Sequence, residues 1–393
     1  MEKSNPQFEH KMWIMTVIKK IMKKLRNTFP QLGHRMWITS LEMQNFRNYE
    51  SQKIDFSENV NVFYGDNAQG KTNIIEAIFM CSIGKSFRTS KEKETIKHNE
   101  EFTNIVLKYK NKDRDGNIKV QISNKKTIFV NGVKVKKLSE LLGKVNIVLF
   151  TPDDINILKN GPDQRRKFLN MMIGQIRPNY VNILNTYTKV MEQRNNYLKQ
   201  IRDLDDKTKI NYELLDIWDE KLASLSYKIC LYRTEFINKI SEKIKDIHKN
   251  ITENKEEIKI EYITESSDEK KLLELIKQRR KLDIIKGYTT KGAHRDDFNI
   301  YIDGDLVNVY GSQGQHRTAV LSLKMSELEI IKEETGESPI LLLDDFMSEL
   351  DSKRRKNLLS NIGDTQVIIT CTDEMENNFL GNIYKVKEGK VIK

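Results

Sequence analysis

Residues 65–72 read Gly-Asp-Asn-Ala-Gln-Gly-Lys-Thr and match G-x-x-x-x-G-K-[ST], the pattern of a phosphate-binding loop. Gly65 and Gly70 allow the tight backbone turns that bring N–H groups within reach of phosphate oxygens. Lys71 would place a positive charge on the β- and γ-phosphates of a nucleotide, and the Thr72 hydroxyl would ligate Mg2+. The predicted nucleotide-binding residues are Gly65, Asp66, Asn67, Ala68, Gln69, Gly70, Lys71 and Thr72.

The sequence on both sides of this loop has the pattern that such a loop requires. Residues 60–64, Val-Asn-Val-Phe-Tyr, alternate and are rich in β-branched and aromatic side chains, which predicts a strand. After the loop, Ile74, Ile78 and Cys81 recur at helical spacing. An isolated glycine-containing surface turn is the alternative, and the strand–loop–helix setting argues against it.

Composition restricts the class of protein. The chain has 393 residues and a net charge of +11, enough length for two or three domains. No apolar run approaches the roughly 18 residues that span a bilayer, and no secretory signal peptide is recognisable. The three cysteines, Cys81, Cys230 and Cys371, lack the spacing of a metal site. We expect a cytoplasmic protein without a membrane span.

Charge is concentrated at the N-terminus. Residues 1–35 contain eight Lys or Arg and two Glu, so they hold +6 of the total and the rest holds +5. Apolar residues at helical spacing beside Lys19, Lys20, Lys23 and Lys24 are compatible with a basic helix for DNA or a membrane surface. Because Met36 begins a clear strand pattern, we expect residues 1–35 to be an extension outside the fold.

The predicted fold is built from two halves that flank a helical insert. The first strand pattern begins at Trp37, which we place with Leu41 and Met43 on one face of the strand. Farther along the chain, Asn131-Gly132 predicts a hairpin turn, and residues 145–150 predict a buried strand. Between about residues 153 and 288 the chain reads as helical, with two heptad seams. The first seam comprises Leu184, Tyr187, Met191, Arg194, Leu198 and Ile201, and the second comprises Trp218, Leu222, Leu225, Ile229, Tyr232 and Phe236. They predict either a short antiparallel coiled-coil-like hairpin or an ordinary helical bundle.

After residue 287 strand patterns return and supply acidic groups. Residues 298–302 lead into Asp303-Gly304, a second hairpin signal. Residues 340–343 form an apolar run that ends in Asp344, the expected second Mg2+ ligand, and Asp345 is placed to orient or deprotonate an attacking water. Together with Lys71, these two aspartates are the predicted catalytic residues.

Ser312-Gln313-Gly314-Gln315 stands at the predicted start of a helix. A Ser hydroxyl and Gly N–H groups at a helix N-terminus make an anion site. Since one ATP does not need two phosphate cradles from one chain, we interpret Ser312, Gly314 and Gln315 as completing the nucleotide site of a second protomer. The alternative is a simple helix cap.

Several of these motifs together resemble the RecF family of ABC-type ATPases, which is related to SMC and Rad50. The motifs that carry the resemblance are residues 45–49, 65–72, 151–154, 161–162, 165–166, 292–297, 311–317 and 341–351. The resemblance implies an α/β fold, an ABC-type P-loop ATPase head with a mixed sheet, split by a helical lobe. The expected boundaries are 1–35, 36–155, 156–288 and 289–393.

The resemblance also implies a function and its partners. Family members bind double-stranded DNA and single-strand/double-strand junctions, act with RecR and RecO, and help load a recombinase at gaps. It implies an ATP-dependent homodimer, a nucleotide contact by Arg47, and a loop at residues 348–351 that carries signals across the dimer interface. Asp345 instead of Glu, and Thr370-Cys371-Thr372 where a His is usual, suggest slow hydrolysis.

Other functions fit less of the sequence. A transporter ATPase would share the two phosphate motifs but not the roughly 240 residues between Thr72 and Ser312. An SMC-like tether would need far longer coiled coils, and a small-molecule kinase would leave Ser312 unexplained. Basic residues on or near the helical insert are candidates for DNA contacts: Lys159, Arg165, Arg166, Arg279, Arg280 and Lys281.

Overall fold

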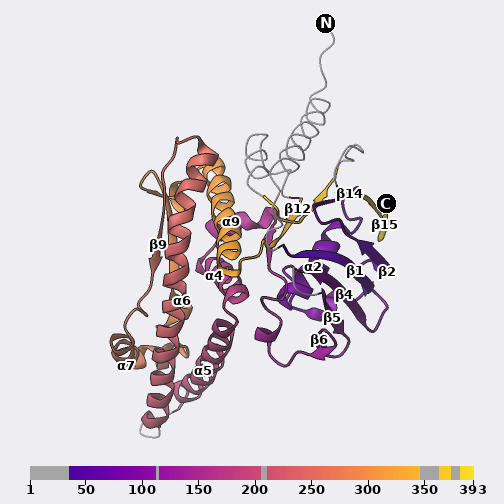
Figure 1. Ribbon diagram of the computed structural model, residues 1–393. Coiled ribbons are helices and arrows are strands. Elements are labelled where there is room, and N and C mark those ends of the chain that lie inside the picture. The colour runs from indigo at the N-terminus through magenta and orange to yellow at the C-terminus, as the bar shows by residue number, and fades with distance from the viewer. Residues whose placement is uncertain (1–34, 112–114, 205–209, 346–362, 373–380) are drawn as a thin grey trace. The chain divides into compact units, whose positions relative to one another are not determined.

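Contacts within the chain divide it into two compact units, a head unit and an insert unit. The computed structural model describes residues 35–111, 115–204, 210–345, 363–372 and 381–393 (Figure 1). The head unit comprises the described residues up to Asp154 and those from Leu321 onward, and the insert unit comprises Ile155–Val320. The first expected boundary, at 155/156, lies one residue from this division. The second, at 288/289, does not coincide with it.

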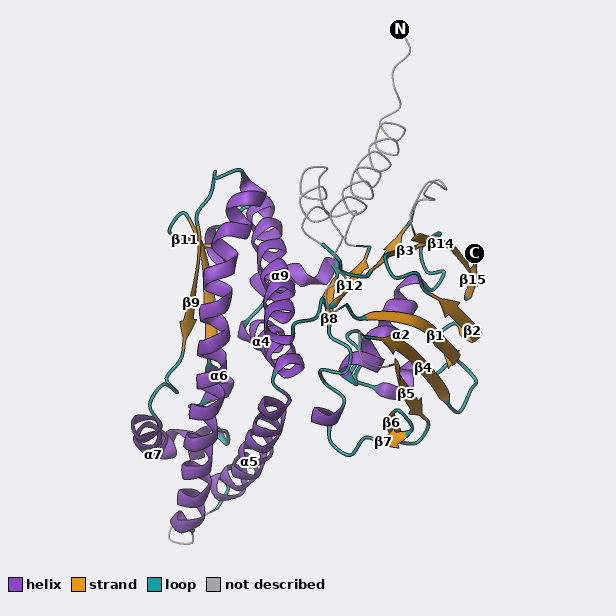
Figure 2. Ribbon diagram, in the orientation of Figure 1, coloured by secondary structure: helices purple, strands orange, loops and turns teal. Residues whose placement is uncertain are grey.

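The first sheet of the head unit is antiparallel and has the order β2-β1-β4-β5-β6-β7 (Figure 2). Its strands are β1 (Trp37–Phe46), β2 (Tyr49–Asp55), β4 (Thr103–Lys110), β5 (Asp115–Ile122), β6 (Lys126–Val130) and β7 (Val133–Lys134). Asn131 and Gly132 join the last two strands with φ of 50° and 79°, as the predicted type I′ turn requires.

A bulge in β1 corrects one expectation for this sheet. The register against β4 shifts between Ile38 and Ser40, so the side chains change face there. Ile38 precedes the shift and Leu41 follows it, and both are fully buried, whereas Trp37 is only half-buried. Trp37 therefore does not share a face with Leu41 and Met43.

The second sheet is mixed and confirms the predicted fold class. Its order is β15-β14-β3-β13-β12-β8, parallel throughout except for the edge strand β15. The strands are β3 (Val60–Tyr64), β8 (Ile147–Phe150), β12 (Ile340–Asp344), β13 (Val367–Cys371), β14 (Gly381–Lys387) and β15 (Lys390–Ile392). Parallel strands need cover on both faces, which explains their apolar runs. Because β3, β12 and β13 are parallel, their carboxyl ends meet at one edge of the sheet.

Helix α2 (Lys71–Ile83) contacts strands of both sheets of the head unit. It is therefore covered on every side, and eleven of its thirteen residues are buried. Short 3-10 turns η1 (Glu92–Thr95), η2 (Leu138–Glu140) and η3 (Pro152–Ile155) connect the remaining elements. A helix buried all round holds its N-terminus, and with it the phosphate-binding loop, in a fixed position.

The insert unit is a helical bundle with a small sheet. Its helices are α3 (Asn156–Lys159), α4 (Pro162–Ile176), α5 (Pro178–Arg202), α6 (Tyr212–Thr252), α7 (Glu269–Lys286), the turn η5 (Ala293–Arg295), α8 (Val307–Tyr310) and the first part of α9 (Gln313–Thr335). Helices α5 and α6 pack on each other as the predicted hairpin, and α7 packs on both of them. The hairpin is therefore part of a helical bundle, so the two alternatives are combined in the structure.

One strand of the insert was not predicted. β9 (Ile258–Ile263) lies inside the stretch that was expected to be helical, and it pairs antiparallel with β10 (Asp297–Ile302). β11 (Asp305–Leu306) completes the sheet through the predicted hairpin, where Asp303 and Gly304 have φ of 52° and 90°. Because β9 belongs to the insert, its pairing places β10 there too, which is why the second boundary lies beyond residue 289.

The buried seam of α6 differs from the predicted one. Leu222, Ile229 and Phe236 are buried as expected, but Trp218, Leu225 and Tyr232 are only half-buried. The buried positions form a neighbouring 4-3 repeat made of Leu215, Asp219, Leu222, Ser226, Ile229, Arg233, Phe236 and Ile240. Three of these are polar, so a search for apolar residues could not find them. Asp219 pairs with the buried Arg194 at 2.7 Å and Arg233 with Asp296 at 2.9 Å.

Some expectations lie outside the described residues, namely those for residues 1–34 and for the loop 348–351. Arg35, the first described residue, bonds to the backbone oxygen of Glu58 and to the Asn59 side chain. Within the described parts of the chain, every helix is too short or too polar to cross a membrane.

Candidate nucleotide-binding site

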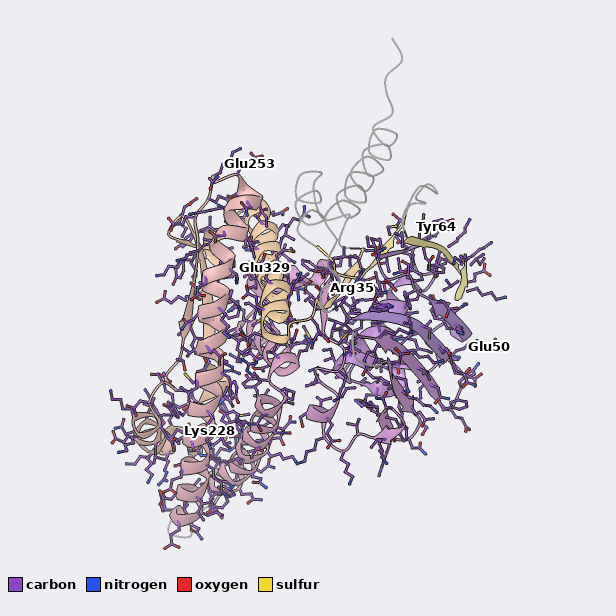
Figure 3. All side chains as sticks on the ribbon, viewed as in Figure 1. Arg35, Glu50, Tyr64, Lys228, Glu253 and Glu329 are labelled. Carbon is purple, nitrogen blue, oxygen red and sulfur yellow. The ribbon has the colours of Figure 1, made fainter. Side chains whose placement is uncertain are left out.

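The phosphate-binding loop connects β3 to α2 and depends on its glycines. Tyr64, labelled in Figure 3, ends β3 directly before the loop. Gly65 and Gly70 have φ of 151° and 115°. A Cβ on Gly70 would lie 2.7 Å from the Asn48 side chain and 3.0 Å from the Tyr49 hydroxyl, and one on Gly65 would lie 2.3 Å from the Val386 backbone oxygen. Both positions therefore require glycine for conformation and for space.

Lys71 is the first residue of α2 and is 4% exposed. Its Nζ donates hydrogen bonds of 2.7 Å to Gly65 O and 2.9 Å to Asp66 O. The loop's own carbonyls thus hold the ammonium group across the loop. Asp66, Asn67 and Ala68 at the tip are exposed.

The turn between β1 and β2 supports the phosphate-binding loop through hydrogen bonds. Asn48 Nδ2 donates to Gln69 O at 2.9 Å, and the Tyr49 hydroxyl donates to Gly70 O at 3.1 Å. Asn73, in the first turn of α2, donates to Asn48 Oδ1 at 2.8 Å. Burial raises the pKa of Tyr49, so its hydroxyl remains a donor. Sequence reasoning identified residues 45–49 as a motif but did not assign this role.

The two predicted Mg2+ ligands lie together. Thr72 Oγ1 donates to Asp344 Oδ1 at 2.9 Å, and Thr370 Oγ1 donates to the same oxygen at 2.8 Å. Neighbouring ligands of an octahedral Mg2+ with bonds of 2.0–2.1 Å lie about 3 Å apart. The separation of the Thr72 and Asp344 oxygens therefore fits this ion.

Burial dominates the electrostatics of Asp344. The residue is 6% exposed, and burial raises the pKa of its carboxyl, while hydrogen bonds from Thr370 and Thr72 oppose that shift. The next residue, Asp345, is half-buried and has a φ of 46°; its N–H donates to Thr370 Oγ1 at 2.9 Å. Thr370 thus fixes both aspartates at the edge where β12 and β13 end.

Arg47, a predicted nucleotide contact, lies beside α2 in a charge cluster around the buried Glu76. Its Nε and Nη2 donate to the two oxygens of Glu76, at 2.9 and 2.6 Å. Arg88 Nη1 donates to the same carboxylate at 3.2 Å and to Asn73 Oδ1 at 2.8 Å. Sequence reasoning missed Glu76 and Arg88, although an acidic residue on a helix that is otherwise apolar on every face was a usable signal.

The predicted second phosphate site forms a capping box in the insert unit. Gln315 N donates to Ser312 Oγ at 3.2 Å, and Ser312 N donates to Gln315 Oε1 at 2.9 Å. Ser312 and Gln313 are exposed, and Gly314 is half-buried. The structure therefore shows the helix cap. The proposed contact with a second protomer remains a prediction.

Three of the six candidate DNA contacts have structural roles. Arg165 is 5% exposed and binds both oxygens of Asp297, at 2.6 and 2.9 Å. Arg280 bonds to the carboxylates of Asp216 and Asp219, and Arg166 bonds to the Asp296 backbone oxygen and to Asp163. Lys159, Arg279 and Lys281 are exposed and remain candidates.

Comparisons with known proteins identify the family of the chain. The family model described as the RecF/RecN/SMC N terminal domain matches residues 37–392. The DNA replication and repair protein RecF of Clostridium acetobutylicum is 41% identical over 366 residues, which cover 90% of this chain and 99% of that protein. RecF of Clostridium perfringens strain SM101 is 45% identical over 342 residues, with coverage of 85% and 92%.

Solved structures show the same relationship. A structure of the recombination mediator protein RecF with ATP, from the RecFOR pathway, has a TM-score of 0.83 and 39% identity, covering 92% of this chain and 99% of that one. An Smc head domain derived from Pyrococcus furiosus has a TM-score of 0.52 at 19% identity, with coverage of 91% and 96%, and shares the fold alone. Because the family model spans most of the chain and the two curated relatives are more than 40% identical to it, the chain belongs to the RecF/RecN/SMC family and, within it, to the RecF proteins.

Proposed function

We propose that this protein is an ATP-dependent DNA-binding protein of replication and recombinational repair. The observation that carries the proposal is the hydrogen bond between Thr72 and Asp344, because it brings the two Mg2+-binding motifs of an ATPase to one point. The similarity to proteins named DNA replication and repair protein RecF, one of them solved with ATP, supports it.

Each residue of the site has a role in this proposal. The N–H groups of residues 65–72 and the Lys71 ammonium bind the phosphates of ATP. Thr72 and Asp344 hold Mg2+, which would neutralise charge on the phosphate oxygens. Asp345 orients a water and accepts its proton as the water oxygen attacks the γ-phosphorus and ADP leaves. Asp345 is one methylene shorter than the usual Glu, so the enzyme is expected to be weak.

A second protomer completes the site. Ser312, Gly314 and Gln315 of one protomer bind the γ-phosphate held by Lys71 of the other, and Arg47 adds a nucleotide contact. This ATP-dependent homodimer clamps double-stranded DNA or a single-strand/double-strand junction in the cytoplasm. With mediators of the RecR and RecO type it helps load the recombinase at gaps. The similarity to RecF structures from the RecFOR pathway supports these partners, and no observation favours the transporter alternative.

The test is ATP hydrolysis and sedimentation of the purified protein, with and without a gapped DNA duplex. We expect slow hydrolysis that DNA accelerates, and a dimer that forms only with ATP. Hydrolysis indifferent to DNA, without dimers, would leave an ATPase of another kind and reopen the transporter and kinase alternatives.

A further inference from the structure

One carboxylate beside the phosphate-binding loop has an unusual set of partners. Glu76, five residues after Lys71 in α2, has no exposed surface. It accepts two hydrogen bonds from Arg47, one from Arg88 and one from the Ser86 hydroxyl, the last at 2.5 Å. Every partner donates, so the geometry requires the ionised carboxylate.

Two guanidinium groups share the Glu76 carboxylate, so among these three side chains the positive charge exceeds the negative charge by one. Arg47 Nη1 also donates to the backbone oxygen of Glu94 at 2.6 Å, and the charge of Arg47 acts on the Glu94 carboxylate. The two cations repel each other, and the buried Glu76 keeps both in place. The side chain of Arg47 is 18% exposed and that of Arg88 is 43% exposed, whereas the Glu76 side chain is fully buried, so the two cations are the accessible part of the cluster. If the cluster served only to neutralise Glu76, one arginine would be enough.

Hydrogen bonds connect the cluster to the phosphate-binding loop. Arg88 donates to Asn73, Asn73 donates to Asn48, and Asn48 donates to the backbone oxygen of Gln69, each at 2.8–2.9 Å. A displacement of Arg88 would therefore be transmitted through Asn73 and Asn48 to the phosphate-binding loop.

We propose that Glu76 is a positioning residue that holds the excess positive charge of Arg47 and Arg88 at the nucleotide phosphates. This role rests on the ATP hydrolysis proposed above. Glu76 does not touch the substrate; it sets the orientation of two cations that stabilise charge developing on the phosphates. The ligand class it serves is a nucleoside triphosphate.

The test is the Glu76→Gln variant in the full-length protein. Gln keeps the size of the side chain, but its amide nitrogen cannot accept the second hydrogen bond from Arg47. We expect kcat for ATP hydrolysis to fall at least about tenfold, while the Kd for ATP changes less than threefold because both cations remain. The matched control is Glu50→Gln, which makes the same change on an exposed side chain and should leave kcat at the wild-type value.

A double-mutant cycle with Arg88→Met identifies the route of the effect. If Glu76 acts through Arg88, kcat of the double variant should lie within about threefold of kcat of Glu76→Gln alone. Full additivity would overturn the part of the role assigned to Arg88, and a Glu76→Gln variant with wild-type kcat would overturn the role altogether. Should Glu76→Gln fail to fold, Ser86→Ala removes one bond to the carboxylate without changing charge, and a kcat equal to wild type would overturn the role as well. A wild-type chain that hydrolyses no ATP refutes the proposed function itself, an outcome distinct from these.

Discussion

The hydroxyl of Thr72 and the carboxylate of Asp344 lie 2.9 Å apart, although 272 positions separate them in the chain. Thr72 is the second residue of α2, the helix that follows β3, and Asp344 ends β12. Strand β13 lies between β3 and β12, and its Thr370 bonds to the same oxygen of Asp344. Parallel pairing thus brings the oxygens that are predicted to bind Mg2+ together at one edge of the sheet.

Asp344→Asn should raise the stability of the fold while it lowers ATP hydrolysis. Burial raises the pKa of Asp344, so the folded state favours the protonated form; stability therefore rises as the pH falls through the folded pKa, and the ionised group destabilises the fold at neutral pH. Asn keeps the Oδ1 acceptor and removes the charge. We expect a higher Tm and at least about a hundredfold loss of ATP hydrolysis, measured by calorimetry and phosphate release. The exposed control Asp115→Asn should change neither, and a lower Tm for Asp344→Asn would contradict the argument.

Lys71→Ala should weaken ATP binding about a hundredfold, because it removes the buried ammonium that serves the phosphates. ATP-dependent dimerisation should be lost with it. Filter binding measures the first effect and gel filtration the second. Lys53→Ala, which removes an exposed ammonium from β2, is the control; unchanged nucleotide binding by Lys71→Ala would exclude the loop as the phosphate site.

Gly70→Ala should destabilise the fold by about 2–4 kcal/mol. The φ of 115° strains an alanine, and the new methyl group would meet Asn48 and Tyr49 within 3.0 Å. Gly161→Ala is the comparison, because that glycine is extended and has open space around its Cβ; we expect a loss below about 1 kcal/mol. Urea unfolding measures both, and equal losses would show that the loop tolerates a side chain.

His294 should make the insert unit sensitive to acid. Burial lowers the pKa of His294 to about 4, and its ring bonds to the Tyr187 hydroxyl and to Thr289 O. The unfolded chain takes up this proton near pH 6.5 and the folded chain only near pH 4, so stability is complete above pH 6.5 and falls by up to about 3 kcal/mol as the pH drops to 4. His294→Gln should reduce the slope in urea unfolding between pH 7 and 4 and leave the part due to the buried His248, whose pKa burial also lowers, whereas the exposed His98→Gln should keep the whole slope. Parallel profiles for wild type and His294→Gln would assign the acid sensitivity elsewhere.

Ser312→Asp should distinguish the helix cap from the contact with a second protomer. Asp caps a helix as well as Ser does, so the free energy of unfolding should stay within about 0.5 kcal/mol, whereas Ser312→Ala should lose about 1 kcal/mol. The added carboxylate would repel the γ-phosphate of the partner's ATP. We expect wild-type ATP binding without dimers in gel filtration; dimers of Ser312→Asp with ATP would argue against the shared site.

Local sequence pattern determined the strand, loop and helix around residues 60–83, the two hairpin turns at Asn131 and Asp303, and the buried strand that ends in Asp344. These predictions were correct because each depends only on residues that are close together in the sequence. A turn that needs positive φ favours Gly, Asn or Asp, a strand buried on both faces is apolar throughout, and a phosphate loop needs Gly and Lys at fixed spacing.

Only the tertiary structure decided which polar residues are buried. Asp219, Ser226 and Arg233 occupy the α6 seam because partners from distant parts of the chain satisfy their hydrogen bonds and charges, and Arg165 is an ion-pair partner of Asp297 although it reads as a DNA contact. The burial of the Glu76 carboxylate likewise depends on its hydrogen bonds from Arg47 and Arg88. An ionic or hydrogen-bonded group can be buried only where its partner lies, and that position depends on the whole fold, which is why local pattern could not show it.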